Sequence, residues 1–216
     1  MEEPTLSPKI SDSEKEKRKM HIIQSATEVF KRKGYVNSTM QDIVDETEMS
    51  RGWVYLYFSN KEDIMLAILA ENDQQTEAQI NSLLTSGLSV WQGLSGLIDM
   101  MDQQLSHASD DLPIVVYEYF IIGWKQPERR EYLEAHYKKQ HDFLLLYLQR
   151  GVVQGEFKPS VDLEVIIRMI TSYFEGLLLH SKAAGSRNVQ VSEQLNLFKS
   201  MLKSVLQVNE QDGGLS

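Results

Sequence analysis

The sequence contains no cysteine among its 216 residues. That absence excludes disulfides, cysteine-based zinc fingers, iron–sulfur clusters and thiol nucleophiles. Proline is also scarce, with 5 residues, and Pro113, Pro127 and Pro159 stand where helices are expected to begin or end. No period-two alternation marks a strand, and no Asn-Gly or Asp-Gly turn lies between apolar alternations. The sequence therefore predicts an all-α protein.

Long apolar runs are missing too. The most apolar stretch, residues 114–124, contains Glu118 and is shorter than the roughly 20 residues that span a bilayer. The N-terminus is polar and has no apolar segment behind its charges, so it does not look like a signal peptide. We therefore expect a cytoplasmic protein without membrane contact.

The signatures of common enzymes and cofactors are absent as well. There is no glycine-rich phosphate loop and no Gly-x-Ser-x-Gly elbow. His136 and His141 are five residues apart, not the four that bring two rings to one helix face. The sequence predicts a protein that is not an enzyme, with no metal site and no cofactor.

Positive charge is scarce overall but gathers near the N-terminus. The net charge is −9, yet residues 17–39 hold six Lys or Arg and one acid. Because salt screens charges beyond about 8–10 Å, a basic head on an acidic body can still bind phosphates. A charge run can equally be a solvated helix face, and composition alone does not choose between these readings.

Apolar periodicity predicts nine helices. The first begins near Ser13, where Ser13-x-x-Glu16 fits a capping box, and ends before Gly34. The others are expected at residues 39–47, 50–58, 60 to the low eighties, 88–107, 112–125, 127–154, 161–184 and 191–208.

Residues 34–62 contain the physical parts of a helix-turn-helix. Ser38 or Thr39 caps a short helix, and Ser50 caps the next one. Arg51, Gly52 and Trp53 occupy the first turn of that second helix, where a recognition helix meets base edges. The hydroxyls of Tyr55 and Tyr57 and the charge of Lys61 suit phosphates. Tyr55 also lies beside Val54 and near Phe58, which favours a core position for it.

This segment resembles the DNA-binding region of the TetR family of bacterial regulators. The match covers about residues 16–62 and rests on residues in register with the family pattern: Gly34, Tyr35, Thr39, Ile43, Met49, Ser50, Gly52, Val54, Tyr55, Tyr57, Phe58, Lys61 and Glu62. The resemblance implies that Thr39, Tyr57 and Lys61 contact phosphates. It also implies that Arg51, Gly52 and Trp53 meet base edges.

Two departures from the family pattern bear on which operator is read. Thr47-Glu48 stands where the family has Ala-Gly, so Glu48 must accept a turn geometry that glycine takes freely, at roughly 1 kcal/mol if the residue is left-handed. Trp53 replaces a small residue and could stack on a thymine methyl or a sugar. Whether Arg51 reads a guanine or holds a phosphate is left open.

The last two helices predict a homodimer through residues 161–208. Val191, Leu195, Phe198, Leu202 and Val205 are spaced as a narrow bundle seam. Ser172 and Gly176 are small and four apart, which lets another helix approach closely. Packing of both helices within their own monomer is the alternative. Two-fold symmetry is favoured because such a helix-turn-helix reads paired half-sites.

The middle of the chain is expected to form an effector pocket from large, adaptable side chains. The predicted lining residues are Trp91, Met101, Tyr117, Glu118, Ile121 and Trp124. Most of the aromatic residues fit an ordinary core equally well. Glu118 shares a helix face with apolar residues and needs a partner, either a cationic ligand or an arginine such as Arg129, Arg130 or Arg168.

The sequence therefore predicts a flexible segment at residues 1–12, a three-helix helix-turn-helix domain at 13–62, a helical ligand-binding and dimerisation domain at 63–208 and a disordered tail at 209–216. The predicted function is a DNA-binding transcriptional regulator, a repressor released from a palindromic double-stranded operator by a small lipophilic effector. The alternatives are an activator, a regulator that needs its ligand to bind DNA, or a helical ligand-binding or enzymatic dimer with a vestigial helix-turn-helix.

Overall fold

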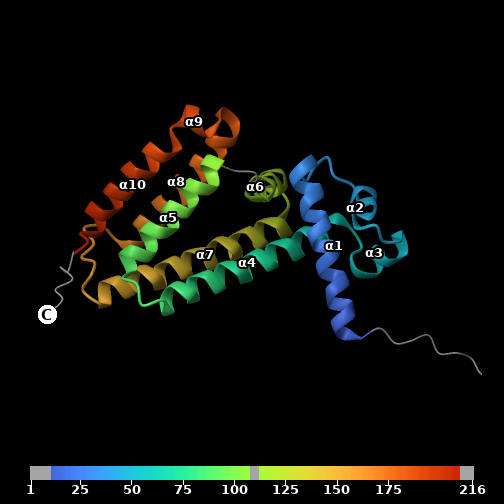
Figure 1. Ribbon diagram of the computed structural model, residues 1–216, viewed down its shortest axis with the longest axis horizontal. Coiled ribbons are helices and arrows are strands. Elements are labelled where there is room, and N and C mark those ends of the chain that lie inside the picture. The colour runs from blue at the N-terminus through green and yellow to red at the C-terminus, as the bar shows by residue number, and fades with distance from the viewer. Residues whose placement is uncertain (1–10, 108–111, 210–216) are drawn as a thin grey trace, which may run out of the picture. The chain divides into compact units, whose positions relative to one another are not determined.

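The protein folds as a series of helices joined by short turns (Figure 1). The computed structural model describes residues 11–107 and 112–209, and these ranges contain no strand. The helices are α1 (Asp12–Lys33), α2 (Met40–Thr47), α3 (Arg51–Tyr57), α4 (Lys61–Thr85), α5 (Val90–His107), α6 (Leu112–Gly123), α7 (Pro127–Val153), α8 (Leu163–Ala184), α9 (Ser186–Val189) and α10 (Val191–Leu206). The all-α prediction is confirmed.

Two local features of the helices differ from the sequence analysis. The N-cap of α1 is Ser11 rather than Ser13, and its hydroxyl accepts a hydrogen bond from the Glu14 N–H at 3.2 Å. The one-turn helix α9 was not predicted. It is set off by positive φ angles at Gly185 and Gln190, +86° and +56°, and four residues are too few to show a period.

The chain divides into two compact units, and the first carries the helix-turn-helix. It comprises residues 1–73 together with the middle turn of α6, residues 115–119. Within it α1 packs on α2, and α2 on α3. Its core consists of side chains at most 8% exposed: Ile22, Ile23, Ala26, Val29, Phe30, Tyr35, Ile43, Val44, Val54, Phe58, Ile64, Met65, Ile68, Leu69, Val115 and Tyr119. The sequence placed the domain boundary at 62/63, whereas the compact unit runs to Asp73.

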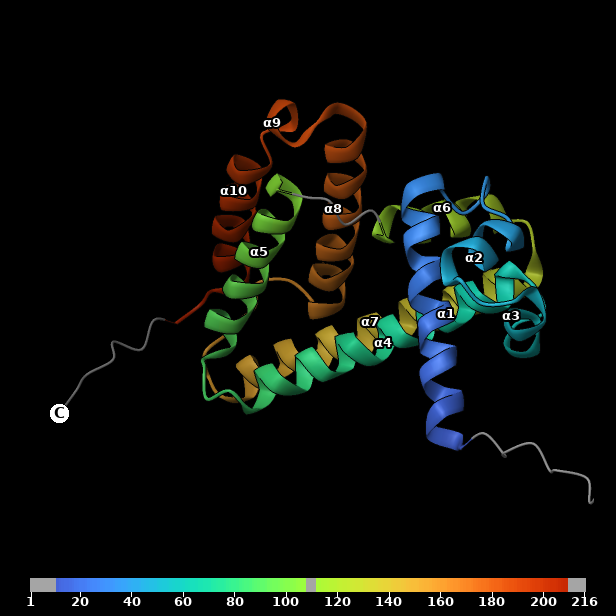
Figure 2. The same cartoon turned by 45° about the vertical axis from the view of Figure 1, so that its right-hand side comes forward.

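The second unit comprises residues 74–114 and 120–216. Helix α10 lies alongside α5 in both ribbon views (Figures 1 and 2), and α7 packs on α5 and α8. The second half of α4 runs beside α7, where Lys139 pairs with Glu77 at 3.6 Å. Buried side chains from α5, α7, α8 and α10 form one continuous core.

The turn at residues 155–159 ties α7 to the start of α5. The carboxylate of Glu156 accepts hydrogen bonds from the N–H groups of Val90 and Trp91, each at 2.8 Å. Phe157 is buried against Gly151, where a Cβ would come within 2.4 Å of its ring. The predicted break before the last long helices is confirmed, because α7 ends at Val153 and α8 begins at Leu163.

The seam predicted for the dimer packs inside the chain instead. Val191, Leu195, Phe198 and Leu202 on α10 are at most 3% exposed and belong to the unit's own core. The ring of Phe198 stacks on Tyr173 of α8 with centroids 4.0 Å apart. A narrow apolar stripe marks a packed face but does not say which chain it packs against, and here α5 and α8 cover it.

The predicted flexible segments at residues 1–12 and 209–216 fall almost entirely outside the described residues, apart from Ser11, Asp12 and Asn209. Over the described parts of the chain, no helix combines the length and apolar character that a bilayer crossing requires.

Candidate nucleic-acid interface and ligand cavity

Both ends of α2 have well-defined capping geometry. Thr39 caps α2 in a full capping box with Asp42, as predicted for Ser38 or Thr39, and its hydroxyl also donates to the Asp42 carboxylate at 2.8 Å. The Lys33 ammonium and the Thr39 donors lower the pKa of Asp42 to about 2. At the other end of α2, Glu48 is left-handed with a φ of +55°, as the missing family glycine predicted.

Ser50 stands at the N-cap of α3, as predicted. Its side chain makes no capping hydrogen bond, so its hydroxyl is not used to close the helix. Inside the turn, the Thr47 hydroxyl donates to the Val44 carbonyl at 2.9 Å and accepts from the Met49 N–H at 3.2 Å. This buried threonine holds the angle between α2 and α3.

Helix α3 turns one face to the core and the other to solvent. Val54 and Phe58 are 0% and 5% exposed, while Arg51, Gly52 and Tyr55 lie on the exposed side. Tyr55 is 38% exposed, so the core position favoured for it was wrong. Adjacent helical residues are about 100° apart, and Tyr55 shares a face with Arg51, whose guanidinium lies 5.1 Å from its ring centroid.

Trp53 is held by a residue that the sequence did not single out. The guanidinium of Arg18 on α1 lies 4.5 Å from the Trp53 ring centroid and pairs with Glu14 at 3.2 Å. Trp53 is half-buried in a hollow that is also lined by Lys17 and Met49. No sequence signal joins two residues 35 positions apart on different helices, so the contact could be found only in the fold.

Lys61 holds a loop in this structure. Its ammonium donates to the carbonyls of Tyr35, Val36 and Ser38 at 2.8, 3.1 and 2.8 Å. These three bonds match the three donors that a lysine has. A phosphate contact by Lys61, as the resemblance implied, requires one of these bonds to be exchanged.

Glu118 binds the same loop from the opposite side. Its carboxylate accepts from the N–H groups of Tyr35 at 2.8 Å and Val36 at 3.3 Å. Gly34 has a φ of +77°, and a Cβ there would lie 3.0 Å from a Glu118 oxygen. Glu118 thus has backbone N–H partners rather than an arginine, and it lies in the first unit. The 82 residues that separate it from Val36 hid this role in the sequence.

Four of the six basic residues near the N-terminus are paired with acids on α1 or α2, and one of them is Arg18, which pairs with Glu14. Lys31 pairs with Glu28 at 3.3 Å, Arg32 with Glu46 at 2.6 Å and Lys33 with Asp42 at 2.6 Å. Among the described residues, Lys17, Lys19 and Arg51 make no ion pair. Tyr57 is half-buried at the end of α3.

The second unit contains a cavity of about 430 Å³ between α4, α5, α7 and α8. This volume lies within the roughly 300–1,000 Å³ of small-molecule sites. Most of its lining is apolar: Ile80, Leu83, Leu94, Leu97, Ile98, Met100, Met101, Leu144, Ile170 and Phe174. Its polar lining is Thr76, Gln79, Gln104, His136, Tyr137, Gln140, Thr171 and Glu175.

The structure does not bring the six predicted pocket residues together. Met101 lines the cavity, and Trp91 lines a separate hollow beside the 155–159 turn. Ile121 and Trp124 are 53% and 64% exposed, and Tyr117 belongs to the first unit with Glu118. The cavity residues sit on ordinary amphipathic faces, where the sequence does not distinguish a cavity wall from a filled core.

Within the described ranges, no three His, Asp or Glu side chains gather in a way that could hold a metal ion.

Comparisons with known proteins match both units. Residues 22–68 match the family described as bacterial regulatory proteins, tetR family, and residues 93–192 match the tetracyclin repressor-like C-terminal domain. The HTH-type transcriptional regulator YfiR of Bacillus subtilis is 34% identical over 95% of this chain and 100% of its own length. The HTH-type transcriptional repressor KstR2 of Mycolicibacterium smegmatis is 24% identical over 71% of this chain and 74% of its own.

Solved structures share the fold. Salmonella enterica GusR superposes with a TM-score of 0.72 at 21% identity, covering 92% of this chain and 98% of its own. The regulator FadR from Bacillus subtilis, in complex with stearoyl-CoA, has a TM-score of 0.69 at 23% identity and covers 88% and 99%.

Proposed function

The chain belongs to the TetR family and is a DNA-binding transcriptional regulator with a ligand-binding C-terminal domain. We propose that it is a repressor that a small lipophilic effector releases from its operator. The observation that carries the proposal is the exposed face of α3, which presents Arg51, Gly52 and Tyr55 on a helix fixed to the core by Val54 and Phe58. We propose that the protein acts in the cytoplasm by binding DNA and ligand and that it catalyses no reaction.

The proposed DNA contacts fall into two groups. Arg51, Gly52 and Trp53 meet base edges in the major groove, and Ser50, Tyr55 and Tyr57 contact phosphates through their hydroxyls. Thr39 contacts a phosphate when its hydroxyl exchanges the bond that it donates to Asp42. Lys61 acts mainly through the loop that it holds. Lys17 and Lys19 are further candidates for phosphate contacts, because no described acid neutralises them.

We propose a homodimer through α8 and α10, on a face other than the predicted seam. On α10, Leu197 and Met201 are 62% and 47% exposed and lie one turn apart. On α8, Val165 is 55% exposed, and nothing lies within 4 Å of a Cβ built at Gly176. Apolar and small residues on the open faces of two neighbouring helices suit a four-helix interface with two-fold symmetry. Such a dimer presents two α3 helices to half-sites about 34–36 Å apart.

The cavity of the second unit is the proposed effector site. Its mostly apolar lining suits a lipophilic molecule, and the structure of the relative FadR with stearoyl-CoA supports that chemistry. Helix α6 contributes residues to both units, and its Glu118 holds the loop before α2. We propose that ligand binding shifts α6 and thereby this loop. DNA affinity then falls by the difference in ligand affinity between the two states.

In vitro transcription tests repression directly. An operator is first selected from genomic fragments with the purified protein, and transcription from the adjoining promoter is then measured with increasing protein. A repressor lowers the transcript level. A rise would instead establish an activator, and an effect that appears only with added ligand would establish a regulator that requires its ligand.

A further inference from the structure

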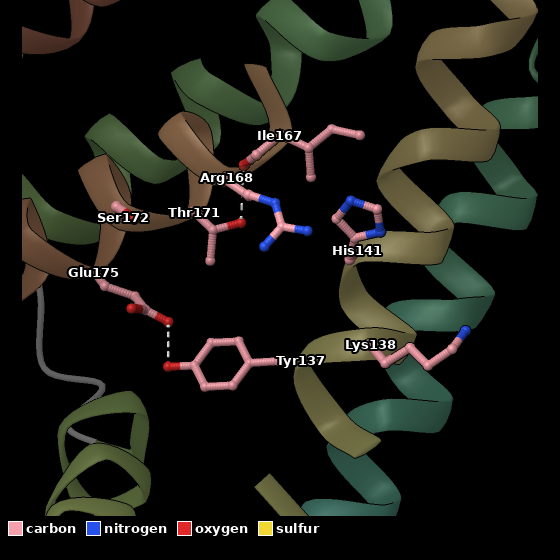
Figure 3. A pocket seen from close by; sticks show the side chains of 8 residues that line it. All are labelled: Tyr137, Lys138, His141, Ile167, Arg168, Thr171, Ser172 and Glu175. Carbon is pink, nitrogen blue, oxygen red and sulfur yellow. Dashed lines mark hydrogen bonds between the residues drawn. The ribbon is translucent and has the colours of Figure 1, made fainter. Parts of the chain in front are cut away.

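Among the described residues that line the cavity of the second unit, a single side chain, Glu175, is fully charged. Apart from His136, its described polar lining consists of neutral hydroxyls and amides plus Glu175, and none of the lining residues that the structure describes is a lysine or arginine. Glu175 lies on α8 at the point where the cavity meets a second hollow of about 450 Å³ (Figure 3). The apolar interior and the charged group therefore stand at different places, which suits an amphiphilic ligand.

Glu175 has a neutral partner. The Tyr137 hydroxyl donates to its carboxylate at 2.9 Å, across the gap between α7 and α8 (Figure 3). Among the described residues, no cation pairs with Glu175. A carboxylate at the mouth of an apolar cavity gains most from a ligand group that brings a positive charge and donors.

The basic residues of the adjoining hollow are already paired with acids. Lys138 pairs with Asp142, whose pKa it lowers by hydrogen bonding. His141 and Arg168 both contact Glu164, at 2.7 and 3.6 Å. Each of these basic side chains therefore already faces an acid, and Glu175 adds a third carboxylate to Asp142 and Glu164. This arrangement offers a carboxylate or phosphate head group no cation that is not already shared with an acid.

We propose that the effector is a monocationic amphiphile, an alkyl or aryl chain carrying one ammonium group. The chain fills the space between Leu94, Leu97, Ile98 and Phe174, and the ammonium binds Glu175. The inference rests on the proposed ligand-regulated function and narrows its ligand class. A cationic ligand would distinguish this chain from a regulator that binds acyl thioesters of coenzyme A, because the phosphates of coenzyme A would face the Glu175 carboxylate.

The test compares ligands that differ only in their head group. Decylamine, decanol, decanoate and decanoyl-coenzyme A, each below its critical micelle concentration, are titrated into the full-length protein by calorimetry. We expect decylamine to bind about fivefold or more tightly than decanol, and decanoate to bind more weakly than decanol. The advantage of the amine shrinks as salt is raised, because the contact is partly exposed.

Two variants assign the site. Glu175→Gln removes the preference for decylamine over decanol, whereas Glu193→Gln, an exposed carboxylate on α10, leaves it unchanged. Leu97→Trp fills the cavity and weakens all the decyl compounds, with its helical content checked by circular dichroism. Tightest binding of decanoate or decanoyl-coenzyme A, no binding of any compound, or a preference that survives Glu175→Gln would each overturn the inference.

Operator release is measured separately on the DNA complex. If decylamine binds through Glu175 but leaves the complex intact, the ligand class stands and the proposed release fails. If decanoyl-coenzyme A binds and releases DNA instead, the proposed function stands and the cationic ligand class is wrong.

Discussion

At the residue scale, Glu48 shapes the turn before α3, and Arg51 lies on the face of α3 that is proposed to contact DNA. Glu48 takes the left-handed conformation in the turn before α3, which costs an L-residue roughly 1–2 kcal/mol relative to glycine. Its carboxylate also puts a negative charge beside the proposed DNA surface. Arg51 lies on the exposed face, over the ring of Tyr55, and makes no ion pair among the described residues. Substitutions of Glu48 distinguish the effect of backbone strain from that of charge, and substitution of Arg51 tests base recognition.

Replacing Glu48 by glycine should stabilise the protein. Relief of the left-handed strain is partly offset by the greater freedom of glycine in the unfolded chain, so we expect a gain of up to about 1 kcal/mol in the free energy of unfolding. Urea denaturation measures it. Glu48→Gln is the matched control, because it removes the charge and keeps the strain. A Gln variant as stable as the Gly variant would show that charge, not backbone conformation, sets the cost.

Replacing Arg51 by alanine should weaken DNA binding about tenfold, within the range for one good contact to a base. Fluorescence anisotropy with the selected operator and with a scrambled duplex checks this. A loss confined to the operator indicates base reading, and an equal loss on both duplexes indicates a phosphate contact. Arg32→Ala is the control, since Arg32 is paired with Glu46 on α2. Unchanged affinity in Arg51→Ala would remove Arg51 from the interface.

At the scale of elements, the loop between α1 and α2 is held by two side chains of opposite charge. The Lys61 ammonium takes three of its carbonyls, and the Glu118 carboxylate takes two of its N–H groups. This loop leads directly into the Thr39 cap of α2. The start of the helix-turn-helix thus depends on the first turn of α4 and the middle turn of α6.

Loss of the Glu118 carboxylate should loosen this loop. Glu118→Ala leaves two backbone N–H groups without their acceptor, and we expect a loss of about 1–2 kcal/mol in the free energy of unfolding, together with weaker operator binding. Glu118→Gln keeps an acceptor oxygen, so its stability and operator affinity should lie between those of the wild type and Glu118→Ala. Denaturation and anisotropy are both measured, with the exposed Glu131→Ala on α7 as control. If Glu118→Ala matched the wild type in both, the loop would not depend on this contact.

The long helices could be predicted from sequence because their apolar periods and breakers are local. Gly34 and the 155–159 turn marked helix ends correctly, and the residues in family register placed the helix-turn-helix. The contacts of Glu118 with Val36 and of Arg18 with Trp53 could not be found, since each joins distant segments. The α10 stripe was assigned to the wrong partner because periodicity identifies a buried face without naming what buries it.

At the scale of the whole molecule, binding of a palindromic operator requires two copies of the chain. Leu197→Glu on α10 should shift the protein to monomer, because it places a charge in the proposed interface. Sedimentation velocity measures this shift to monomer. Loss of the dimer should also lower operator affinity, because the two half-sites are then bound independently. Leu146→Glu, on an exposed apolar position of α7, is the matched control. A Leu197→Glu protein that stays dimeric would exclude this face as the interface.

Fluorescence anisotropy across a salt series measures whether the protein binds DNA sequence-specifically. The purified protein is titrated with a labelled fragment from upstream of its own gene, with fragments obtained by genomic selection and with a scrambled duplex of equal length. We predict nanomolar binding to at least one genomic fragment, about 10³-fold or more tighter than to the scramble, with affinity that falls steeply as salt rises. Equally weak binding to every fragment and to the scramble would show that the protein does not bind DNA sequence-specifically.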